Sequence, residues 1–477
     1  MALRKSKIIN PYPDGKPIRT TQTIYRCHGY AWTGDYRTAG LHTTGPRNSD
    51  GNVRRYGAKG DGKSDDTRAI QSAIDAANGI VYFPKGVYRI TRTIDIELDK
   101  LGFTAIYGDG TAAIVMAGAG PAFRFRGTHE KSADPKGFAD NVWTRQRMPV
   151  VDNIGIVGDH PESVGVEAVG TMQLTITRLH VRKALHGIHL RGNNRNLAVA
   201  DCHLYENRGI GIFYDDVNLH QSNITGCHIS YNGGGGIVSR GGNVRNIHIT
   251  GCDIESNMGR DMPATANVLI DCSTSQWGTA EVAITGCTIQ HNAYGPDSAN
   301  VRIIGGSDYG NPTRRRRWGN ITITGNIFSD VMVNVHLVEC RGLTITGNTF
   351  WEGFDHHMLL EKCRIVAIGP NVFDTNDAYA RDKAAMNNVK FSECEDCTIT
   401  GLQVNYARGD AAVALEKCHR MNLSHCNITN SEKVGLMLTD LRDSVVMGCV
   451  IRNDNSTNTR TMVMEGGEGN VVKDNLA

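Results

Sequence analysis

The sequence predicts an all-β fold, namely a single-stranded right-handed parallel β-helix with an N-terminal capping helix. Two short phrases recur along the chain at a spacing close to the length of one β-helix coil. Glycine is abundant at 54 residues, aromatic residues make up only 6%, and the hydrophobic 40% falls in short runs. This is a composition rich in turns and strands.

The first phrase is Ile-Thr-Gly-Cys or a close variant of it. Its last residue recurs every 25 residues at Cys202, Cys227 and Cys252, and equivalents follow at Cys287, Asn326, Asn348, Cys426 and Cys449. Because these residues occupy one point of each coil, we expect their side chains to stack as an internal Cys/Asn ladder. Longer steps predict loops inserted around 257–266, 272–280 and 305–318.

The second phrase lies downstream of the first in each coil. Examples are Gly211-Ile-Phe-Tyr-Asp215, Gly236-Ile-Val-Ser-Arg240 and Asn267-Val-Leu-Ile-Asp271. Apolar residues hold the second and usually the fourth place. Successive side chains of a strand point to opposite sides, so these places should face the core and the third and fifth places should face solvent.

The chain should divide into an irregular N-terminal extension, residues 1–52, and a β-helix domain, residues 53–477. Apolar residues at helical spacing predict a helix at about 66–77, which Asp65, Asp66 or Thr67 can cap. Residues 79–90 predict two short strands joined by a Pro-Lys-Gly turn.

This start of the domain resembles the N-terminal cap of the pectate-lyase-like β-helix superfamily. The resemblance covers about 40 residues: Tyr56-Gly-Ala-Lys-Gly-Asp-Gly-Lys-Ser-Asp-Asp-Thr67, the amphipathic helix, and Val81-Tyr-Phe-Pro-Lys-Gly-Val-Tyr88. The superfamily includes polysaccharide lyases, rhamnogalacturonase-type glycosidases, mannuronan epimerases and tailspike depolymerases. The resemblance therefore implies this fold and a carbohydrate chain as substrate. The helix would close the exposed backbone edge of the first coil.

Charge and cysteine usage exclude several other classes. Lys and Arg total 51 against 49 for Asp and Glu, which gives no basis for a nucleic-acid partner. The thirteen cysteines are odd in number and match no zinc-binding spacing. Because Cys202, Cys227, Cys252 and Cys287 hold the same place in their coils, we expect them to stack along the axis and to form no disulfides with one another. We expect no metal and no cofactor. No stretch predicts an export signal or a membrane span, which fits a cytoplasmic protein or a secreted one whose signal has been removed.

Aligned coils place outward residues in columns about 4.8 Å apart. The first column holds the residue directly after the ladder position, and it reads His180, His203, His228, Asp253 and Thr288. The second column lies two residues later and reads Arg182, Tyr205, Ser230, Glu255, Gln290, Ser329 and Trp351. The third column is the fifth place of the second phrase and reads Arg191, Asp215, Arg240 and Asp271.

Two carboxylate pairs are candidates for catalysis. Asp253 and Glu255 share one strand face, with their Cα atoms about 6.6 Å apart. Paired carboxylates at that scale suit an acid and a base acting on a glycosidic bond. Asp215 and Asp271 lie two coils apart with Arg240 between them. Each pair also has an interpretation without catalysis. Asp253 and Glu255 would be solvated surface carboxylates, and Asp215 and Asp271 would form a ladder of alternating charge with Arg240.

Imidazoles and aromatic rings surround these carboxylates. His203 and His228 have the pKa range of a general acid or base, and Tyr205, Tyr231 and Trp351 can stack on sugar rings. Arg191, Arg240 and Gln290 are further substrate-binding candidates. Trp277, Tyr294 and Trp318 lie nearby, and the run Arg314 to Arg317 suits a solvated loop tip, a subunit contact or a clamp for acidic sugars.

The pattern favours a carbohydrate-active enzyme that hydrolyses glycosidic bonds. A polysaccharide lyase is the alternative, with Arg191, Arg240, His203 and Tyr205 as its groups. No calcium-binding spacing is present. An epimerase is less favoured, because Gly353-Phe-Asp-His-His357 lacks the proline of the epimerase motif and is offset within its coil. A non-enzymatic tailspike-like protein is less favoured because the coil pattern continues almost to residue 477. By analogy with the family we expect a homotrimer.

Overall fold

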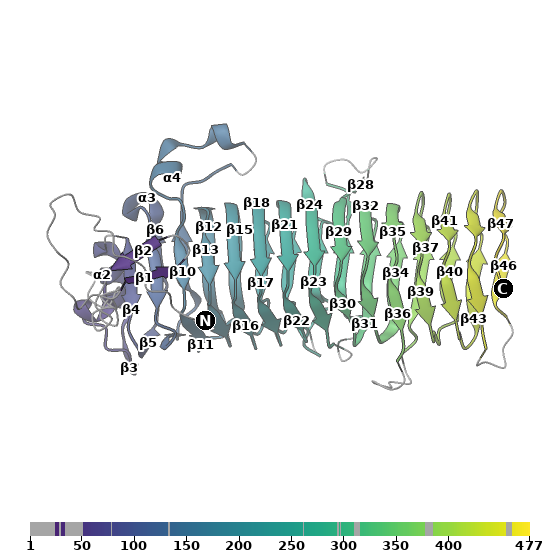
Figure 1. Ribbon diagram of the computed structural model, residues 1–477. Coiled ribbons are helices and arrows are strands. Elements are labelled where there is room, and N and C mark those ends of the chain that lie inside the picture. The colour runs from purple at the N-terminus through teal and green to yellow at the C-terminus, as the bar shows by residue number, and fades with distance from the viewer. Residues whose placement is uncertain are drawn as a thin grey trace.

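The computed structural model describes residues 24–27, 30–33 and 51–477, apart from 78, 132–133, 261, 293–294, 296, 310–314, 377–384 and 455–459. Parallel strands stack coil upon coil along one axis, so the molecule is a long rod (Figure 1). The predicted right-handed parallel β-helix is confirmed. Within residues 1–50, the described part is one antiparallel hairpin of β1 (Ile24–Cys27) and β2 (Tyr30–Thr33).

Each coil contributes strands to three faces, which we call A, B and C in the order that the chain visits them. Face A follows the second sequence phrase. Its strands are β6 Ile94–Glu97, β9 Gly120–Arg126, β12 Ser163–Met172, β15 His186–Ala200, β17 Ile212–Asp215, β20 Ile237–Arg240, β23 Ala266–Asp271, β26 Ala299–Ile304, β31 Val331–Val338, β34 Gly353–Glu361, β37 Asn388–Ser392, β40 Ala411–Glu416, β43 Val434–Thr439 and β46 Met462–Glu465.

Face B ends in the first sequence phrase. Its strands are β4 Ile80–Phe83, β7 Ala105–Gly108, β10 Val150–Asp152, β13 Thr175–Thr177, the second half of β15, β18 Asn218–Thr225, β21 Asn243–Thr250, β24 Gly278–Thr285, β29 Gly319–Thr324, β32 Arg341–Thr346, β35 Arg364–Ile368, β38 Thr398–Thr400, β41 Asn422–Ser424, β44 Val445–Met447 and β47 Val471–Lys473. Long strands such as β15 pair with strands of both faces, so A and B join into one sheet.

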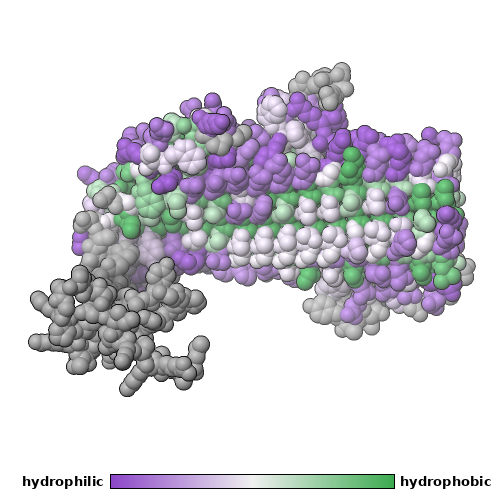
Figure 2. Space-filling view, turned by 45° about the horizontal axis from the view of Figure 1, so that its top comes forward, coloured by the Kyte–Doolittle hydropathy of each residue, from purple (hydrophilic) through white to green (hydrophobic). Residues whose placement is uncertain are grey.

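Face C is a separate sheet of short strands. They are β3 Asp61–Asp65, β5 Gly86–Ile90, β8 Ala112–Met116, β11 Gly155–Gly158, β14 His180–Arg182, β16 His203–Tyr205, β19 His228–Ser230, β22 Asp253–Glu255, β25 Thr288–Gln290, β30 Ile327–Phe328, β33 Thr349–Phe350, β36 Val372–Asp374, β39 Gln403–Asn405, β42 Asn427–Thr429 and β45 Val450–Arg452. Neighbouring coils are in register, and Figure 2 accordingly shows lengthwise rows of like side chains along the rod.

A helix packs on the first coils, as the sequence predicts. Helix α2 (Thr67–Ala76) buries Ile70 and Ile74 in the core, and β4 and β5 lie on either side of the Pro-Lys-Gly turn. Asp66 holds the N-cap position but does not cap with its side chain. Its carboxylate instead accepts from the backbone N–H groups of Lys59 and Gly60, while Asp65 accepts from Thr67 N. The other short helices are η2 Val53–Tyr56, α3 Leu98–Leu101, η3 Pro135–Gly137 and α4 Asp140–Thr144.

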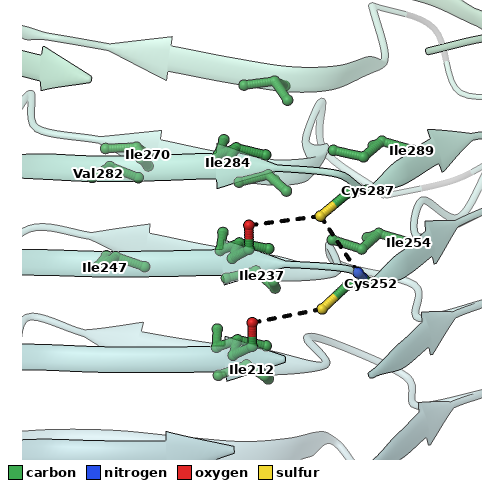
Figure 3. Packing of buried hydrophobic residues seen from close by; sticks show 14 of the residues in the cluster. Ile212, Ile237, Ile247, Cys252, Ile254, Ile270, Val282, Ile284, Cys287 and Ile289 are labelled. Carbon is green, nitrogen blue, oxygen red and sulfur yellow. Dashed lines mark hydrogen bonds between the residues drawn. The ribbon is translucent and has the colours of Figure 1, made fainter. Parts of the chain in front are cut away.

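The cysteine ladder runs inside the corner between faces B and C. Cys252 N donates to Cys287 Sγ at 3.5 Å, beside stacked isoleucines (Figure 3). Further along, Asn326 replaces cysteine and accepts from Cys287 N at 2.9 Å. The predicted absence of disulfides among Cys202, Cys227, Cys252 and Cys287 is confirmed, since all four are buried free thiols.

Replacing Cys227 by Ser should lower stability and leave turnover unchanged. The thiol is buried, and its Sγ lies 3.4 Å from Thr225 O and 3.8 Å from Val199 O. A hydroxyl is more costly to bury there, by about 1–3 kcal/mol. Thermal denaturation should therefore show a lower Tm. An unchanged Tm, or loss of turnover in a folded protein, would contradict the structural role.

A second ladder, which the sequence did not reveal to us, runs between faces C and A. Buried asparagine side chains donate from one coil to the next: Asn207 to Asn232 at 2.8 Å, Asn232 to Asn257 at 2.7 Å, Asn257 to Asn267 at 2.8 Å, Asn267 to Asn300 at 2.8 Å and Asn300 to Asn334 at 2.7 Å. The two ladders fix the corners at which face C begins and ends.

One expectation about face A is wrong. We expected the third place of the second phrase to face solvent, but Val238 and Leu269 are buried although they point outward. They form a second apolar cluster outside the rod with Phe213 and Val333. Beside it, the buried Arg302 guanidinium donates to Asp297 at 2.8 Å. Alternation gave the direction of these side chains correctly, but it could not predict that they would be covered.

Candidate functional site

The predicted columns of face C exist in the structure. Strand pairing aligns His203 with His228, His228 with Asp253, and Tyr205 with Ser230 and then Glu255. These side chains point away from the core, because Leu204, Ile229 and Ile254 between them point inward and are buried. Short strands held at both ends by internal ladders therefore present one continuous polar surface.

Each catalytic carboxylate candidate on this face has an imidazole beside it. His228 Nδ1 lies 3.5 Å from Asp253 Oδ2, and His291 Nδ1 lies 3.1 Å from Glu255 Oε2. Gln290 Nε2 donates to Glu255 Oε2 at 3.4 Å. On its other side, His291 Nε2 lies 3.7 Å from Asp330 Oδ2. We call Asp253, Glu255, His228 and His291 the face C site.

The two carboxylates differ in electrostatic environment. Partial burial, followed by repulsion from Glu255, raises the pKa of Asp253. Glu255 is in turn held by His291 and Gln290. Unequal environments are what allows one carboxyl group to hold a proton as an acid while its neighbour stays ionised.

Aromatic rings extend the face C site along the axis. His203 and His228 stack at 4.9 Å between centroids, and Tyr205 stacks on His180 at 4.9 Å. Tyr231 is 58% exposed, and the charge of Glu255 is the main cause that raises the pKa of its phenol. Burial lowers the pKa of His203, so this imidazole holds its proton less tightly.

Sequence reasoning missed His291 and Asp330. Both follow a face C strand and have left-handed backbone, with φ of 56° and 53°. Tyr231 and Ser256 occupy the same place with the same conformation. Aligning the residue after each face C strand as a further column would have found them.

The rival carboxylates lie on a different face. Asp215 and Asp271 end strands β17 and β23 of face A, in register with Arg240 between them. Strand β23 runs from Ala266 to Asp271, so Asp271 lies about 16 Å from the start of its strand. The inserted loop connects Glu255, at the end of β22, to that start. The structure therefore places the two candidate carboxylate pairs on different faces of the rod.

Asp215 and Arg191 belong to a charged network on face A. His189 Nε2 lies 2.9 Å from Asp215 Oδ2, and the buried Glu167 lies between Arg124 at 2.6 Å and His189 at 3.7 Å. Arg191 approaches Glu167 and Asp215, at 3.8 Å each. The residues proposed for a lyase are therefore split, because Arg191 and Arg240 lie on face A and His203 and Tyr205 on face C.

Other candidate residues lie at the margin of the face C site. Gln290 is one coil beyond Glu255, with Ser329 and Trp351 following in the next two coils. Trp351 is thus about 14 Å from Glu255 along the axis. Ser329 is buried and its hydroxyl donates to Gln290 Oε1 at 3.3 Å, so it helps to fix the orientation of the Gln290 side chain.

The arginine run lies on the predicted inserted loop, which forms a hairpin of β27 (Gly306–Ser307) and β28 (Arg316–Arg317). Arg315 Nε donates to Glu339 at 2.7 Å, and Arg316 lies over the ring of Trp277. Arg245 similarly lies over Trp318. These guanidinium groups hold the loop to the rod. Arg314 and Tyr294 lie outside the described residues.

Within the described ranges, no three His, Cys, Asp or Glu side chains are grouped closely enough to hold a metal ion. Among the same residues, no helix is long and apolar enough to cross a membrane.

A family model described as rhamnogalacturonase A/epimerase, pectate lyase-like matches residues 51–297, more than half of the chain. Individual relatives match only a short segment. The alginate lyase 7 of Azotobacter vinelandii is 61% identical over 44 residues, 8% of this chain and 5% of the relative. A probable glucan endo-1,3-beta-glucosidase of Arthroderma benhamiae is 56% identical over 46 residues, 9% of this chain and 5% of the relative. The chain thus spans about one twentieth of these curated relatives.

Similar solved structures cover nearly all of the chain. Tailspike protein 3 of bacteriophage CBA120 covers 96% of this chain and is covered over 65%, at 14% identity and a TM-score of 0.54. The tailspike protein of E. coli bacteriophage HK620, solved as a mutant with a hexasaccharide, covers 95% and is covered over 84%, at 10% identity and a TM-score of 0.52. At these identities the likeness concerns the fold alone.

Proposed function

Because the chain belongs to the rhamnogalacturonase A/epimerase, pectate lyase-like family, we propose that it hydrolyses glycosidic bonds of a polysaccharide or oligosaccharide at the face C site. The observation that carries this proposal is the pair Asp253 and Glu255, each beside an imidazole and in unequal environments. Asp253, whose pKa is raised, acts as the acid that protonates the leaving oxygen. Glu255 acts as the base or nucleophile.

The remaining face C residues bind and orient the sugar. His228 and His291 hold the two carboxylates, and His203 with Tyr205 extends the surface toward the N-terminal coils. Tyr231 can stack on a sugar ring because its phenol side chain is largely exposed. No cofactor takes part in this mechanism.

Two alternatives are less well supported. Elimination needs a base and a cation that neutralises the uronate carboxylate, but Arg191 approaches Glu167 and Asp215 on another face. The names of the matched relatives include a lyase, epimerases and glucosidases, so they support action on polysaccharides without choosing among these reactions. A protein that binds glycans without cleaving them is the second alternative.

Incubation with a panel of polysaccharides, followed by size-exclusion chromatography, tests the proposal. We expect at least one polymer to be shortened by the wild-type protein. Binding of a polymer whose length stays unchanged would favour the non-enzymatic alternative.

The pH dependence should identify the acid. Asp253 must be protonated to act, so turnover should fall as the pH rises through its raised pKa. Measuring kcat/KM from pH 3 to pH 9 should show turnover that falls on the alkaline side of the profile, and a profile that keeps rising across this range would contradict the assignment.

The homotrimer remains a prediction. Of the arginine run that we considered as a subunit contact, Arg315 donates to Glu339 and Arg316 lies over Trp277, so the support for a trimer is the analogy with the family. Light scattering at micromolar concentration should report three chains, and a monomer would remove the idea.

A further inference from the structure

Two neighbouring columns of outward side chains run along face B over five consecutive coils. They come from strands β18, β21, β24, β29 and β32, which lie side by side along the rod (Figure 1). The first column is threonine in every coil: Thr225, Thr250, Thr285, Thr324 and Thr346. The second lies two residues earlier in each strand and holds Asn223, His248, Ala283, Thr322 and Thr344. We call these ten residues the threonine strip.

The threonine strip faces solvent. The residue between the two columns is a buried isoleucine in every coil, at positions 224, 249, 284, 323 and 345, so the strip side chains point away from the core. Thr225, Thr250 and Thr344 are exposed. Within the described part of the chain, the hydroxyl groups of Thr225, Thr250 and Thr285 have no hydrogen-bond partner. Water must therefore satisfy them.

The strip carries none of the four residue types that are charged at neutral pH. Asp, Glu, Lys and Arg make up 21% of the chain, so ten average positions would hold about two of them. Aromatic and large aliphatic side chains are missing from the strip as well. A surface of this length without charge is unusual on a soluble protein, which normally mixes both signs.

This composition argues against the commonest partners. Protein interfaces draw most of their binding energy from buried aromatic and arginine side chains, and threonine is rare among such residues. A sugar ring stacks on aromatic faces, and an anionic polymer or lipid surface needs lysine or arginine. The strip offers none of these groups.

Regular spacing in two directions is what the strip does offer. Neighbouring coils place equivalent side chains about 4.8 Å apart along the axis, and the two columns are about 6.6 Å apart along each strand. Backbone pairing on both sides holds every one of these strands in register. Water oxygens on the faces of hexagonal ice also repeat in two directions at comparable distances. The strip therefore fits a partner that is itself a lattice.

Threonine is suited to hold such a lattice. Its methyl group orders the water beside it, and its hydroxyl group both donates and accepts hydrogen bonds. Branching at Cβ restricts the side chain to few rotamers, so little freedom is lost when water is bound.

We propose that the threonine strip binds ice, by holding a layer of water molecules that continues the ice lattice. This function is separate from the face C site, because the strip lies on another face and uses no carboxylate.

Slow growth of ice on a cooled surface from a stirred solution of the full-length protein tests the proposal. A soluble carrier protein in the same solution gives the fraction that is trapped without binding. We expect the wild-type protein to enter the ice well above that fraction. Thr285→Lys, at the centre of the strip, should lower its entry to the carrier level, because a long charged side chain holds the lattice away from its neighbours. Thr344→Lys, two coils away, should do the same.

The matched control is Thr349→Lys, which adds the same side chain at an exposed threonine of face C and should enter the ice as the wild type does. Melting curves show which variants are folded, and two strip variants keep the test open if one of them is not. Exclusion of the wild type from ice, or entry of a folded strip variant at the wild-type level, would overturn the proposal. So would equal losses for Thr349→Lys and the strip variants. Light scattering covers the remaining possibility: a smaller assembly for Thr285→Lys than for the wild type would assign the strip to a contact between copies instead.

Discussion

Asp253→Asn and Glu255→Gln should each lower turnover by about 10²-fold or more, the scale on which general acid–base catalysis contributes. Both changes keep the size of the side chain and remove its titratable group. The matched controls are Asp215→Asn and Asp271→Asn, on face A. They should retain near-normal turnover, because the structure separates them from the face C site. If all four variants stay active, the carboxylate mechanism is wrong.

The same Asp253→Asn variant should not be less stable than the wild type. In the folded protein the pKa of Asp253 is raised above its unfolded value, so the folded state holds the proton more tightly. Stability is then greatest below the unfolded pKa and falls as the pH rises through the folded pKa. Asp253→Asn should therefore raise Tm at neutral pH, and the gain should shrink in acid. A loss of Tm together with a loss of turnover would point to a structural role.

Asn257→Ala should cause the largest loss of stability, about 3–5 kcal/mol. Asn257 donates to Ile229 O at 2.8 Å and to Asn267 Oδ1 at 2.8 Å, and it accepts from Asn232 at 2.7 Å. Alanine would leave these buried groups without partners. Chemical denaturation measures the change.

The control for this ladder is Asn223→Ala on the exposed side of face B, which should change stability by less than about 0.5 kcal/mol. Equal effects of the two variants would contradict the ladder's contribution. The milder loss expected for Cys227→Ser reflects the cost of burying a hydroxyl in place of a thiol.

The repeat explains why so much could be predicted. A fixed position in each coil predicts a fixed position in space, so the cysteine ladder and the columns of His228, Asp253 and Glu255 followed from alignment alone. The absence of disulfides among the four cysteines followed from their shared place in the coil, whereas the capping helix was predicted from its helical spacing and from the resemblance of its surroundings to the superfamily's cap.

What alignment cannot give is the angle between faces and the fold of inserted loops. Asp271 follows Glu255 closely in sequence, yet a corner of the rod places it on another face. Leu269 points outward as the period predicts, but it is covered, because burial depends on segments that do not repeat. Asp330 and His291 escaped notice because they lie after the strand, where the residues differ from coil to coil.

The most direct test of hydrolysis at the face C site follows reducing ends and ultraviolet absorbance together while the wild-type protein digests a polysaccharide that it shortens. Hydrolysis creates reducing ends without a double bond, so we predict that reducing ends rise while absorbance stays flat, and that both stay flat with Asp253→Asn. Absorbance that rises in step with the reducing ends would show elimination to an unsaturated sugar and would contradict the account.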